Sequence, residues 1–220
     1  VGLIGPGSIG STLLGQIATE SERLKSQFGL DIHIRGIANS KKMLLDRDAI
    51  DPAVWKARFE AEAVELDLER FVHHIGATYF PHSLLIDCTT SSDLALRYID
   101  WLERGIHVIT PNKKAGTSSM EYYNRLFDTA LRTGRRFLYE TTVGAALPVI
   151  GTLQDLVQTG DRIHRIEGIV SGTLAWLFST YDATVPFSSL VRQAKEMGYT
   201  EPDPRDDLSG MDVGRKVVIL

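Results

Sequence analysis

Three glycines near the start of the chain have the spacing of a nucleotide-binding loop. Gly5, Gly7 and Gly10 form a G-x-G-x-x-G pattern between an apolar run and an amphipathic segment, with Ser8 and Ile9 between the second and third glycines. In such a loop the first glycine allows the tight turn, the second lets the backbone approach a pyrophosphate, and the third lets helix and strand pack closely. Free N–H groups at the helix N-terminus favour the anion. The pattern therefore predicts a dinucleotide site.

The residues after the second predicted strand bear on which dinucleotide binds. NAD sites usually place an Asp or Glu there to accept hydrogen bonds from the ribose hydroxyls. This chain instead has Asn39, Ser40, Lys41 and Lys42. Ser40 and a lysine, with Arg35 nearby, are suited to donate to a 2′-phosphate. The sequence therefore favours NADP(H) over NAD(H), and a solvated turn with ordinary surface lysines is the alternative.

Two further polar segments follow predicted strands and are expected to face the same crevice. Thr90 and Ser91 come after a buried-looking strand and open a helix, so they are expected either to contact the cofactor or to cap that helix. Lys113 and Lys114 end the next strand. Positive charge there would lie over a site for phosphate and carbonyl groups.

The densest group of charged residues lies between Gly198 and Lys216. Its four Asp and one Glu, stiffened by two prolines, suit an ammonium group or a divalent metal. Ser209-x-x-Asp212 fits a variant of the capping box, and Asp212 and Lys216 are four residues apart on one helical face. One interpretation is a capped helix with a surface ion pair. The other is a lysine that Asp212 orients as a proton donor to a developing alkoxide.

The composition argues against several classes of protein. The 220 residues are 43% hydrophobic and 24% charged, which is typical of a globular chain, and the net charge of −4 gives no electrostatic footprint for nucleic acid. We expect no membrane partner, because no apolar run reaches the length of a membrane span. A single cysteine and the absence of a leader indicate a reducing compartment, the cytoplasm or an organelle stroma. Both ends are abrupt, so we expect a fragment of a longer chain.

Strand and helix patterns alternate through the first 139 residues. This alternation predicts an α/β fold with a Rossmann-type doubly wound parallel sheet, whose ligands lie at the carboxyl ends of the strands. The pattern changes near residue 140, so we expect an NAD(P)-binding domain over residues 1–139 and the start of an α+β catalytic and dimerisation domain, incomplete in this chain, over residues 140–220. The expected strands are 1–4, 32–38, 84–88, 108–110 and 163–169, and the expected helices are 11–28, 66–74, 94–104, 120–133, 149–159, 173–181, 187–197 and 209–220.

Several segments together resemble the homoserine dehydrogenases, above all the dehydrogenase region of the bifunctional aspartokinase/homoserine dehydrogenases. The resemblance covers essentially the whole chain and implies reduction of L-aspartate 4-semialdehyde to L-homoserine with NAD(P)H, a step towards threonine and methionine. It also implies a homodimer or a larger assembly. The segments that carry it are residues 5–10, 38–40, 108–115, 140–148, 168–173 and 198–216.

The resemblance implies roles for particular residues. Lys216 would be the general acid that protonates the new alkoxide, with Asp212 beside it. Glu201 and Asp207 would take the amino group of the substrate, and Lys114 would lie near the nicotinamide and the substrate carbonyl. The family also binds a monovalent cation, Na⁺ or K⁺, through backbone oxygens, and the matching segment here contains Glu140, Val143, Ala145 and Leu147.

The chain departs from the family pattern at a few positions. Gly214 stands where Ala is usual, which costs the catalytic helix up to about 1 kcal/mol of helix propensity. Ala146 replaces a frequent Gly, which could disturb a turn in the cation loop. Ala175 and Trp176 stand where a small polar residue and Tyr are usual, which puts details of the substrate pocket in doubt.

Two rival functions stay open. The first is a regulatory module that binds NADP without chemistry, against which Lys216 and the acidic segment argue, because a sensor needs no proton donor. The second is a phosphorylating semialdehyde dehydrogenase in which Cys88 would form an acyl-enzyme. No histidine lies near Cys88 in the sequence, and a lone cysteine at the end of a strand is usually a small buried hydrophobe.

Overall fold

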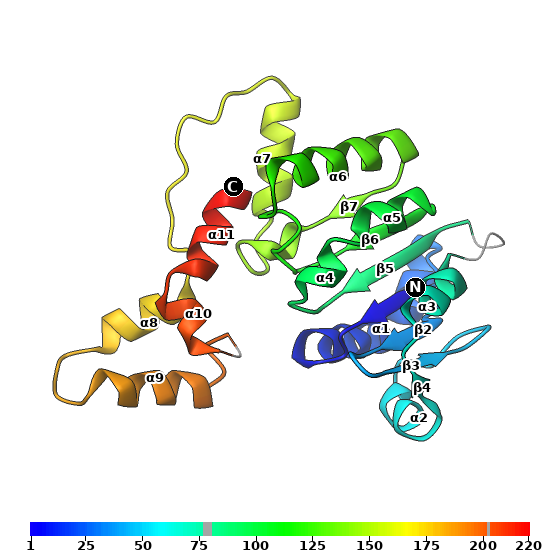
Figure 1. The fold of residues 1–220 in the computed structure, drawn as a ribbon, viewed down its shortest axis with the longest axis horizontal. Helices are drawn as coiled ribbons and strands as arrows, with labels where there is room; N and C mark the ends of the chain where they lie inside the picture. The colour runs from blue at the N-terminus through cyan, green and yellow to red at the C-terminus, as the bar shows by residue number, and fades with distance from the viewer. Residues whose placement is uncertain (77–80, 202) are drawn as a thin grey trace. The chain divides into compact units, whose positions relative to one another are not determined.

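The computed structural model describes residues 1–76, 81–201 and 203–220, so Pro202 of the acidic segment lies outside the described residues. These residues form two compact units, Val1–Tyr139 and Glu140–Leu220 (Figure 1). The boundary lies at the residue where the sequence pattern changes. None of the helices in the described residues combines the length and the apolar character that crossing a bilayer requires.

A seven-stranded sheet forms the centre of the first unit, in the order β4-β3-β2-β1-β5-β6-β7. β1 lies between β2 and β5, and β5, β6 and β7 continue the same parallel arrangement, which confirms the doubly wound part of the prediction. The strands are β1 (Gly2–Ile4), β2 (Gly36–Ala38), β3 (Lys42–Leu45), β4 (Val64–Glu65), β5 (Ser83–Asp87), β6 (Ile106–Ile109) and β7 (Phe137–Leu138).

One edge of this otherwise parallel sheet is antiparallel, which the sequence did not predict. β3 runs antiparallel to β2 and to β4. The reason is the length of the connection, since residues 39–41 can close a hairpin but cannot make the crossover that a parallel neighbour needs. The chain therefore turns back directly after β2, next to the glycine loop.

Helices connect the strands of the first unit. α1 begins three residues earlier than predicted because Gly7 is its N-cap, and the helix predicted at 94–104 divides into α4 and α5. The helix after β3 was not predicted. The helices are α1 (Ser8–Phe28), α2 (Trp55–Glu62), α3 (Leu68–Ile75), α4 (Ser92–Ala95), α5 (Tyr98–Glu103) and α6 (Met120–Thr133).

The sheet is covered on both faces, because alternate residues of a strand point to opposite sides. In β1, Leu3 packs in one buried cluster with Leu14 of α1. The next residue, Ile4, belongs to a second cluster that contains Tyr98 and Trp101 of α5. Burial on both sides holds the carboxyl ends of β1, β5 and β6 in fixed positions.

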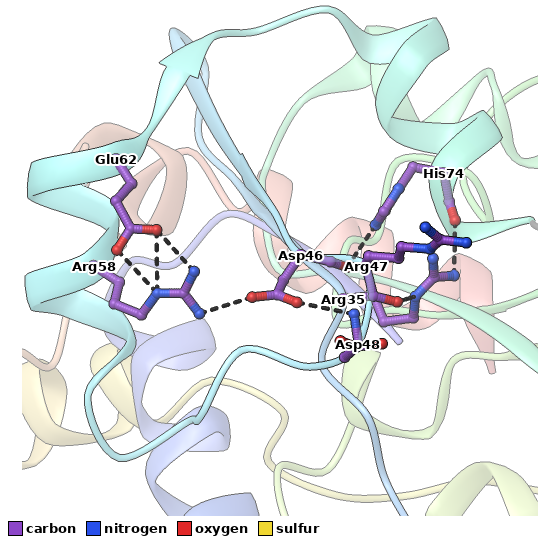
Figure 2. A network of polar contacts seen from close by, with 7 residues as sticks. All are labelled: Arg35, Asp46, Arg47, Asp48, Arg58, Glu62 and His74. Atoms are coloured by element: carbon purple, nitrogen blue, oxygen red, sulfur yellow. Dashed lines mark hydrogen bonds and ion pairs between the residues drawn. The ribbon is translucent and has the colours of Figure 1, made fainter.

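Arg35 belongs to a polar network at the opposite end of β2, which corrects the expectation that it helps to bind a 2′-phosphate. It is 2% exposed, and its guanidinium donates to the carbonyl oxygens of Arg47 (3.1 Å) and His74 (2.9 Å) (Figure 2). The ring of His74 bonds the Asp46 carbonyl at 2.8 Å, and Arg58 donates to the Asp46 carboxylate at 2.9 Å. Arg35 precedes β2, whereas the expected phosphate site follows that strand.

The second unit is helical in its described residues. A small core of Leu177, Leu190 and Ala194 joins α8 and α9. The strand predicted at 163–169 is not formed: none of the described residues pairs with this segment as a strand, and Ile169 is 84% exposed. The elements are a 3₁₀ turn η1 (Glu140–Thr142), α7 (Val149–Gln158), α8 (Gly172–Thr180), α9 (Phe187–Glu196), α10 (Pro204–Leu208) and α11 (Met211–Ile219).

The capping box predicted at Ser209 and Asp212 is also wrong. Ser209 is the C-cap of α10, which was not predicted, and α11 begins only at Met211. Its N-cap is Gly210, whose φ of +74° lies in the left-handed region, and the Ser209 hydroxyl accepts the N–H of Met211, the first helical residue, at 3.3 Å. The sharp turn at Gly210 separates the two helices that carry the acidic residues.

Candidate active site

The glycine loop has the shape that a pyrophosphate needs. Gly5 has a φ of +89°, and its N–H donates to the Ala38 carbonyl at 2.8 Å. A Cβ on Gly10 would lie 2.3 Å from the Gly5 carbonyl oxygen, so only glycine permits this close contact of helix and strand. A Cβ on Gly7 would meet nothing within 4 Å. The loop therefore leaves no room for a side chain at Gly10, whereas the space around Gly7 is open.

The N-terminus of α1 is available to an anion. Gly7 is the N-cap, no side chain of the described residues bonds this cap, and the first turn holds no acidic residue. The first amide groups of a helix have no intrahelical partner, and the helix dipole is positive at this end. Ser8 is exposed and Ile9 is 59% exposed, so the surface above these amides is open. The residues present fit the phosphates of a dinucleotide.

The turn between β2 and β3 carries no carboxylate. Asn39 shapes it: its Oδ1 accepts the backbone N–H groups of Lys41 (2.8 Å) and Lys42 (2.7 Å), and its own N–H donates to the Lys42 carbonyl at 2.9 Å. The Asn39 side chain is thus engaged in the turn. Ser40, Lys41 and Lys42 are exposed beside it.

A buried polar cluster lies where β5 and β6 end. The Asp87 carboxylate is fully buried, and it accepts hydrogen bonds from the Thr89 N–H (2.8 Å), the Tyr98 hydroxyl (2.5 Å) and the Asn112 amide (3.2 Å). Thr110 donates to the Asp87 carbonyl at 2.7 Å. Burial and the neighbouring Asp87 charge raise the pKa of Tyr98, so its hydroxyl stays protonated. Asp87 is the residue before the last in the strand predicted at 84–88, and an acid near the end of a buried strand was the one signal for this cluster.

Asn112 connects this cluster to two predicted site segments. Its amide nitrogen donates to the Ser91 carbonyl at 2.9 Å, and its Oδ1 accepts the Lys114 N–H at 3.0 Å. Ser91 itself caps α4 by accepting the Leu94 N–H at 3.3 Å, as one of the two interpretations expected. Thr90, the residue before Ser91, is exposed. The structure therefore brings the segments of Ser91 and Lys114 together.

Cys88 is poorly suited to nucleophilic catalysis. Burial and the adjacent Asp87 raise the pKa of its thiol to about 11. The thiolate is the reactive form of cysteine, and it is scarce at neutral pH when the pKa is this high.

In the second unit, Lys216 and Asp212 form a mostly buried ion pair. The Lys216 Nζ lies 2.6 Å from Asp212 Oδ2, and the two side chains are 17% and 8% exposed. Nζ also donates to the Val170 carbonyl at 2.7 Å. The interpretation of this pair as a surface ion pair is therefore wrong, since both side chains are mostly buried and a carbonyl 46 residues away accepts from the ammonium.

Glu201 and Asp207 are held next to each other. Asp207 of α10 is 3% exposed, and its Oδ2 accepts the backbone N–H of Glu201 at 2.8 Å. Asp203 caps α10, and the Arg205 side chain that donates to it lowers the Asp203 pKa to about 2. Within the acidic segment, Asp203 therefore pairs with Arg205, and the buried Asp207 lies beside the partly buried Glu201.

The segment predicted to bind a cation is a tight turn. The Glu140 carboxylate accepts the N–H groups of Ile150 (2.8 Å) and Gly151 (2.7 Å), so this side chain caps α7. Gly144 and Ala145 have φ of +84° and +52°. Ala146 does not, so replacing glycine there needs no left-handed backbone. Val143 is buried and Leu147 exposed.

Backbone oxygens are the ligands expected for this cation. Among the described residues, no group of three or more His, Cys, Asp or Glu side chains could hold a metal.

Comparison with known proteins identifies relatives over the whole chain. Residues 5–140 match the family model described as "Homoserine dehydrogenase, NAD binding domain", and residues 148–220 match the one described as "Homoserine dehydrogenase". The "Bifunctional aspartokinase/homoserine dehydrogenase 1, chloroplastic" of Zea mays is 48% identical over 221 residues, 100% of this chain and 24% of its own length. The "Bifunctional aspartokinase/homoserine dehydrogenase 2" of Escherichia coli is 45% identical, over 99% of this chain and 27% of its own length. The chain spans about a quarter of these relatives.

Solved structures share the fold. A Candida auris protein described as of unknown function is 35% identical with a TM-score of 0.79, and the match covers 100% of this chain and 60% of that one. A hyperthermophilic archaeal homoserine dehydrogenase in complex with NADPH has a TM-score of 0.81 at 23% identity, over 99% of this chain and 67% of its own.

Proposed function

Because this chain belongs to the homoserine dehydrogenase family, we propose that it carries the nucleotide-binding unit and part of the catalytic unit of an enzyme that reduces L-aspartate 4-semialdehyde to L-homoserine. The observation that carries this proposal is the buried pair of Lys216 and Asp212, held by a third group, the Val170 carbonyl. A lysine fixed in this way suits proton transfer better than helix stabilisation.

In this proposal Lys216 is the general acid. The described residues engage two of its three N–H donors, one with Asp212 and one with Val170. The third donates to the substrate oxygen. Bound NAD(P)H would supply the hydride that reduces the aldehyde carbon. Lys216 passes its proton to the resulting alkoxide, and Asp212 fixes the ammonium orientation and balances its charge before the transfer.

Glu201 and Asp207 recognise the amino group of the substrate in this proposal. Carboxylates are the natural partners of an ammonium group, and charge-assisted hydrogen bonds of this kind are short and strong. The bond from the Glu201 N–H to Asp207 supports a paired role, because it holds one acid beside the other.

The first unit binds NADP(H) in preference to NAD(H) in this proposal. The missing acid after β2 and the exposed Ser40 and Lys41 support that preference. Lys114 serves the nicotinamide end. The other residues proposed to contact the cofactor are Gly5, Gly7, Ser8, Ile9, Gly10, Asn39, Thr90 and Ser91.

A monovalent cation, Na⁺ or K⁺, is proposed at the turn after η1. The ligands would be backbone oxygens of Glu140, Val143, Ala145 and Leu147. A tight turn over these residues supports this: Gly144 and Ala145 have left-handed backbone, and the Gly144 carbonyl accepts the Leu147 N–H at 2.9 Å. We place the enzyme in the cytoplasm or an organelle stroma, in keeping with the plant relatives named as chloroplastic.

The decisive experiment is an assay of NADPH oxidation by the full-length protein with L-aspartate 4-semialdehyde. We expect turnover and homoserine as the product. A regulatory module would bind NADPH without oxidising it. A thiol enzyme would lose activity on iodoacetamide treatment and keep it when substrate is present, which the raised pKa of Cys88 argues against.

A further inference from the structure

We propose that Asp87 is a positioning residue that locks two loops at the cofactor crevice to each other, one through each oxygen of its carboxylate. The first is the loop between β5 and α4, residues 88–91, and the second is the loop after β6, residues 110–115. The inference rests on the proposed function and adds a residue to it.

The first oxygen holds the loop after β5. Oδ1 of Asp87 accepts the N–H of Thr89 at 2.8 Å. Thr89 in turn accepts the N–H of Ser91 through its hydroxyl at 3.1 Å, and Ser91 caps α4. One carboxylate oxygen therefore sets the path of the chain from the end of the strand to the start of the helix.

The second oxygen holds the loop after β6. Oδ2 accepts the Asn112 amide at 3.2 Å, and Oδ1 of Asn112 accepts the N–H of Lys114 at 3.0 Å. The Asn112 amide also donates to the Ser91 carbonyl at 2.9 Å, so the two loops are joined twice. Lys114 is thus one side chain away from the Asp87 carboxylate.

The Tyr98 hydroxyl fixes the carboxylate from behind. It donates to Oδ2 at 2.5 Å from α5, which carries no predicted site residue. The cluster is buried, since Asp87, Thr110 and Asn112 are at most 4% exposed. Hydrogen bonds to a buried charge are stronger than those between neutral groups, so this carboxylate can hold both loops in fixed positions.

The location gives the cluster a functional consequence. Ligands of open α/β sheets bind outside the carboxyl ends of the strands, where β5 and β6 end. A displacement of about 1 Å in a group that orients the reactants can cost roughly 10²-fold in rate. Asp87 is therefore placed to determine turnover without contacting the substrate or the cofactor.

The test compares three substitutions in the full-length enzyme. Asp87→Asn preserves size but replaces one of the two acceptor oxygens by an NH₂ donor, so the side chain can no longer accept from both Thr89 and Asn112. Asn112→Ala removes the link to Lys114. Tyr98→Phe is the matched control. It removes a buried hydrogen bond to the same oxygen and the 3.1 Å contact of this hydroxyl with the Thr110 side chain, and it leaves the Asp87 bonds to Thr89 and Asn112 in place. We expect kcat to fall about 10- to 100-fold in the first two and about threefold or less in the control. The KM for NADPH should change less than kcat, because the glycine loop is untouched.

Non-additivity provides a second kinetic test. If Asp87 acts through Asn112, the double variant should be no slower than the slower single variant. A general loss of stability would instead lower the melting temperature and the amount of folded enzyme, and it would do so in Tyr98→Phe as well. Equal loss of kcat in all three variants, or fully multiplied losses in the double variant, would overturn the inference.

Hydrogen exchange of peptides covering residues 110–118 separates this inference from the proposed function. Faster exchange in Asp87→Asn and Asn112→Ala than in Tyr98→Phe is expected whatever the substrate is. Unchanged exchange would contradict the positioning role even if the enzyme reduces aspartate semialdehyde. If exchange is faster in these two variants but the wild-type enzyme does not turn over aspartate semialdehyde, the result would instead contradict the proposed function. Should Asp87→Asn fail to fold, Asn112→Ala carries the same test, because it leaves the carboxylate bonded to Thr89 and Tyr98.

Discussion

The ammonium nitrogen of Lys216 lies 2.6 Å from Oδ2 of Asp212 in a pair whose side chains are 17% and 8% exposed. This burial changes what a substitution measures. A surface pair at this spacing contributes only about 0.3–0.5 kcal/mol, whereas removing one partner of a buried pair leaves an uncompensated charge and costs up to about 3–5 kcal/mol. A loss of stability therefore accompanies any single substitution here, and turnover must be measured per folded molecule.

Lys216→Ala should lower kcat by roughly 10²–10⁴-fold, the contribution of a general acid, with little change in NADPH binding. Lys216→Arg should also be slow, because its pKa above about 12 makes it a poor proton donor. The measurement is steady-state turnover at full folding. Retention of more than about a tenth of wild-type turnover by Lys216→Ala would move the acid to Lys114.

The double variant Lys216→Met with Asp212→Leu is the control for stability. It removes both charges, so the free energy of unfolding should recover towards the wild-type value while turnover stays low. Recovery of turnover together with stability would show that the pair is only structural.

Replacing Lys41 and Lys42 by Ser should raise the KM for NADPH more than the KM for NADH, because only NADPH carries the 2′-phosphate. Both lysines are exposed at the turn beside the glycine loop. Lys56→Ser, at an exposed lysine of α2 in the same unit, is the control for the loss of a surface lysine away from the turn. Equal effects on the two cofactors would contradict the NADP preference.

Gly10→Ala and Gly15→Ala should have opposite effects although both lie in α1. A Cβ at Gly10 would lie 2.3 Å from the Gly5 carbonyl, whereas one at Gly15 would meet nothing within 4 Å. We expect Gly10→Ala to destabilise the unit and weaken NADPH binding. Gly15→Ala should raise the free energy of unfolding by up to about 1 kcal/mol through helix propensity. Urea unfolding measures the stability of each variant, and titration with NADPH measures its cofactor binding. Equal free energies of unfolding for Gly10→Ala and Gly15→Ala would contradict the close contact at Gly10.

His74 should make the first unit less stable as the pH falls. Burial, with the nearby Arg35 charge, lowers the pKa of His74 below 6.5, so the fold favours the neutral ring. The unfolded chain then binds more protons, and the stabilisation present above about pH 6.5 is lost as the pH falls through the lowered pKa. His74→Gln should flatten this dependence in urea titrations between about pH 7.5 and 5.5.

The exposed neighbour His73 on α3 is the control for this pH effect. His73→Gln should leave the pH dependence as it is in the wild type. A slope that both substitutions change equally would place the effect elsewhere, for example at His107, whose pKa burial and Arg135 also lower.

The full-length protein should be at least a dimer, as the family resemblance and the small-residue segment at residues 141–148 indicate. Sedimentation velocity at several concentrations measures this, with NADPH oxidation followed on the same sample. An active monomer at every concentration would contradict the expectation.

The local parts of this molecule could be predicted from the sequence alone. Gly5 and Gly10 could be predicted from their spacing, because Gly5 has a left-handed backbone and Gly10 leaves no room for a Cβ. The pairing of Asp212 with Lys216 follows from helical spacing, because residues four apart share a face. The helix over Met120–Thr133 was predicted with the right ends, since Ser119 caps it and Gly134 terminates it.

Only the tertiary structure decided which of these groups are buried and what holds them. Spacing placed Lys216 beside Asp212, but the Val170 carbonyl that completes its surroundings is 46 residues away in the chain. Asp87 joins two loops through Asn112, which is 25 residues further along the chain. Arg35 donates to the carbonyl groups of Arg47 and His74 and therefore does not lie at the phosphate site. Such contacts depend on how the strands and helices pack, and local propensity carries no information about partners that distant packing brings together.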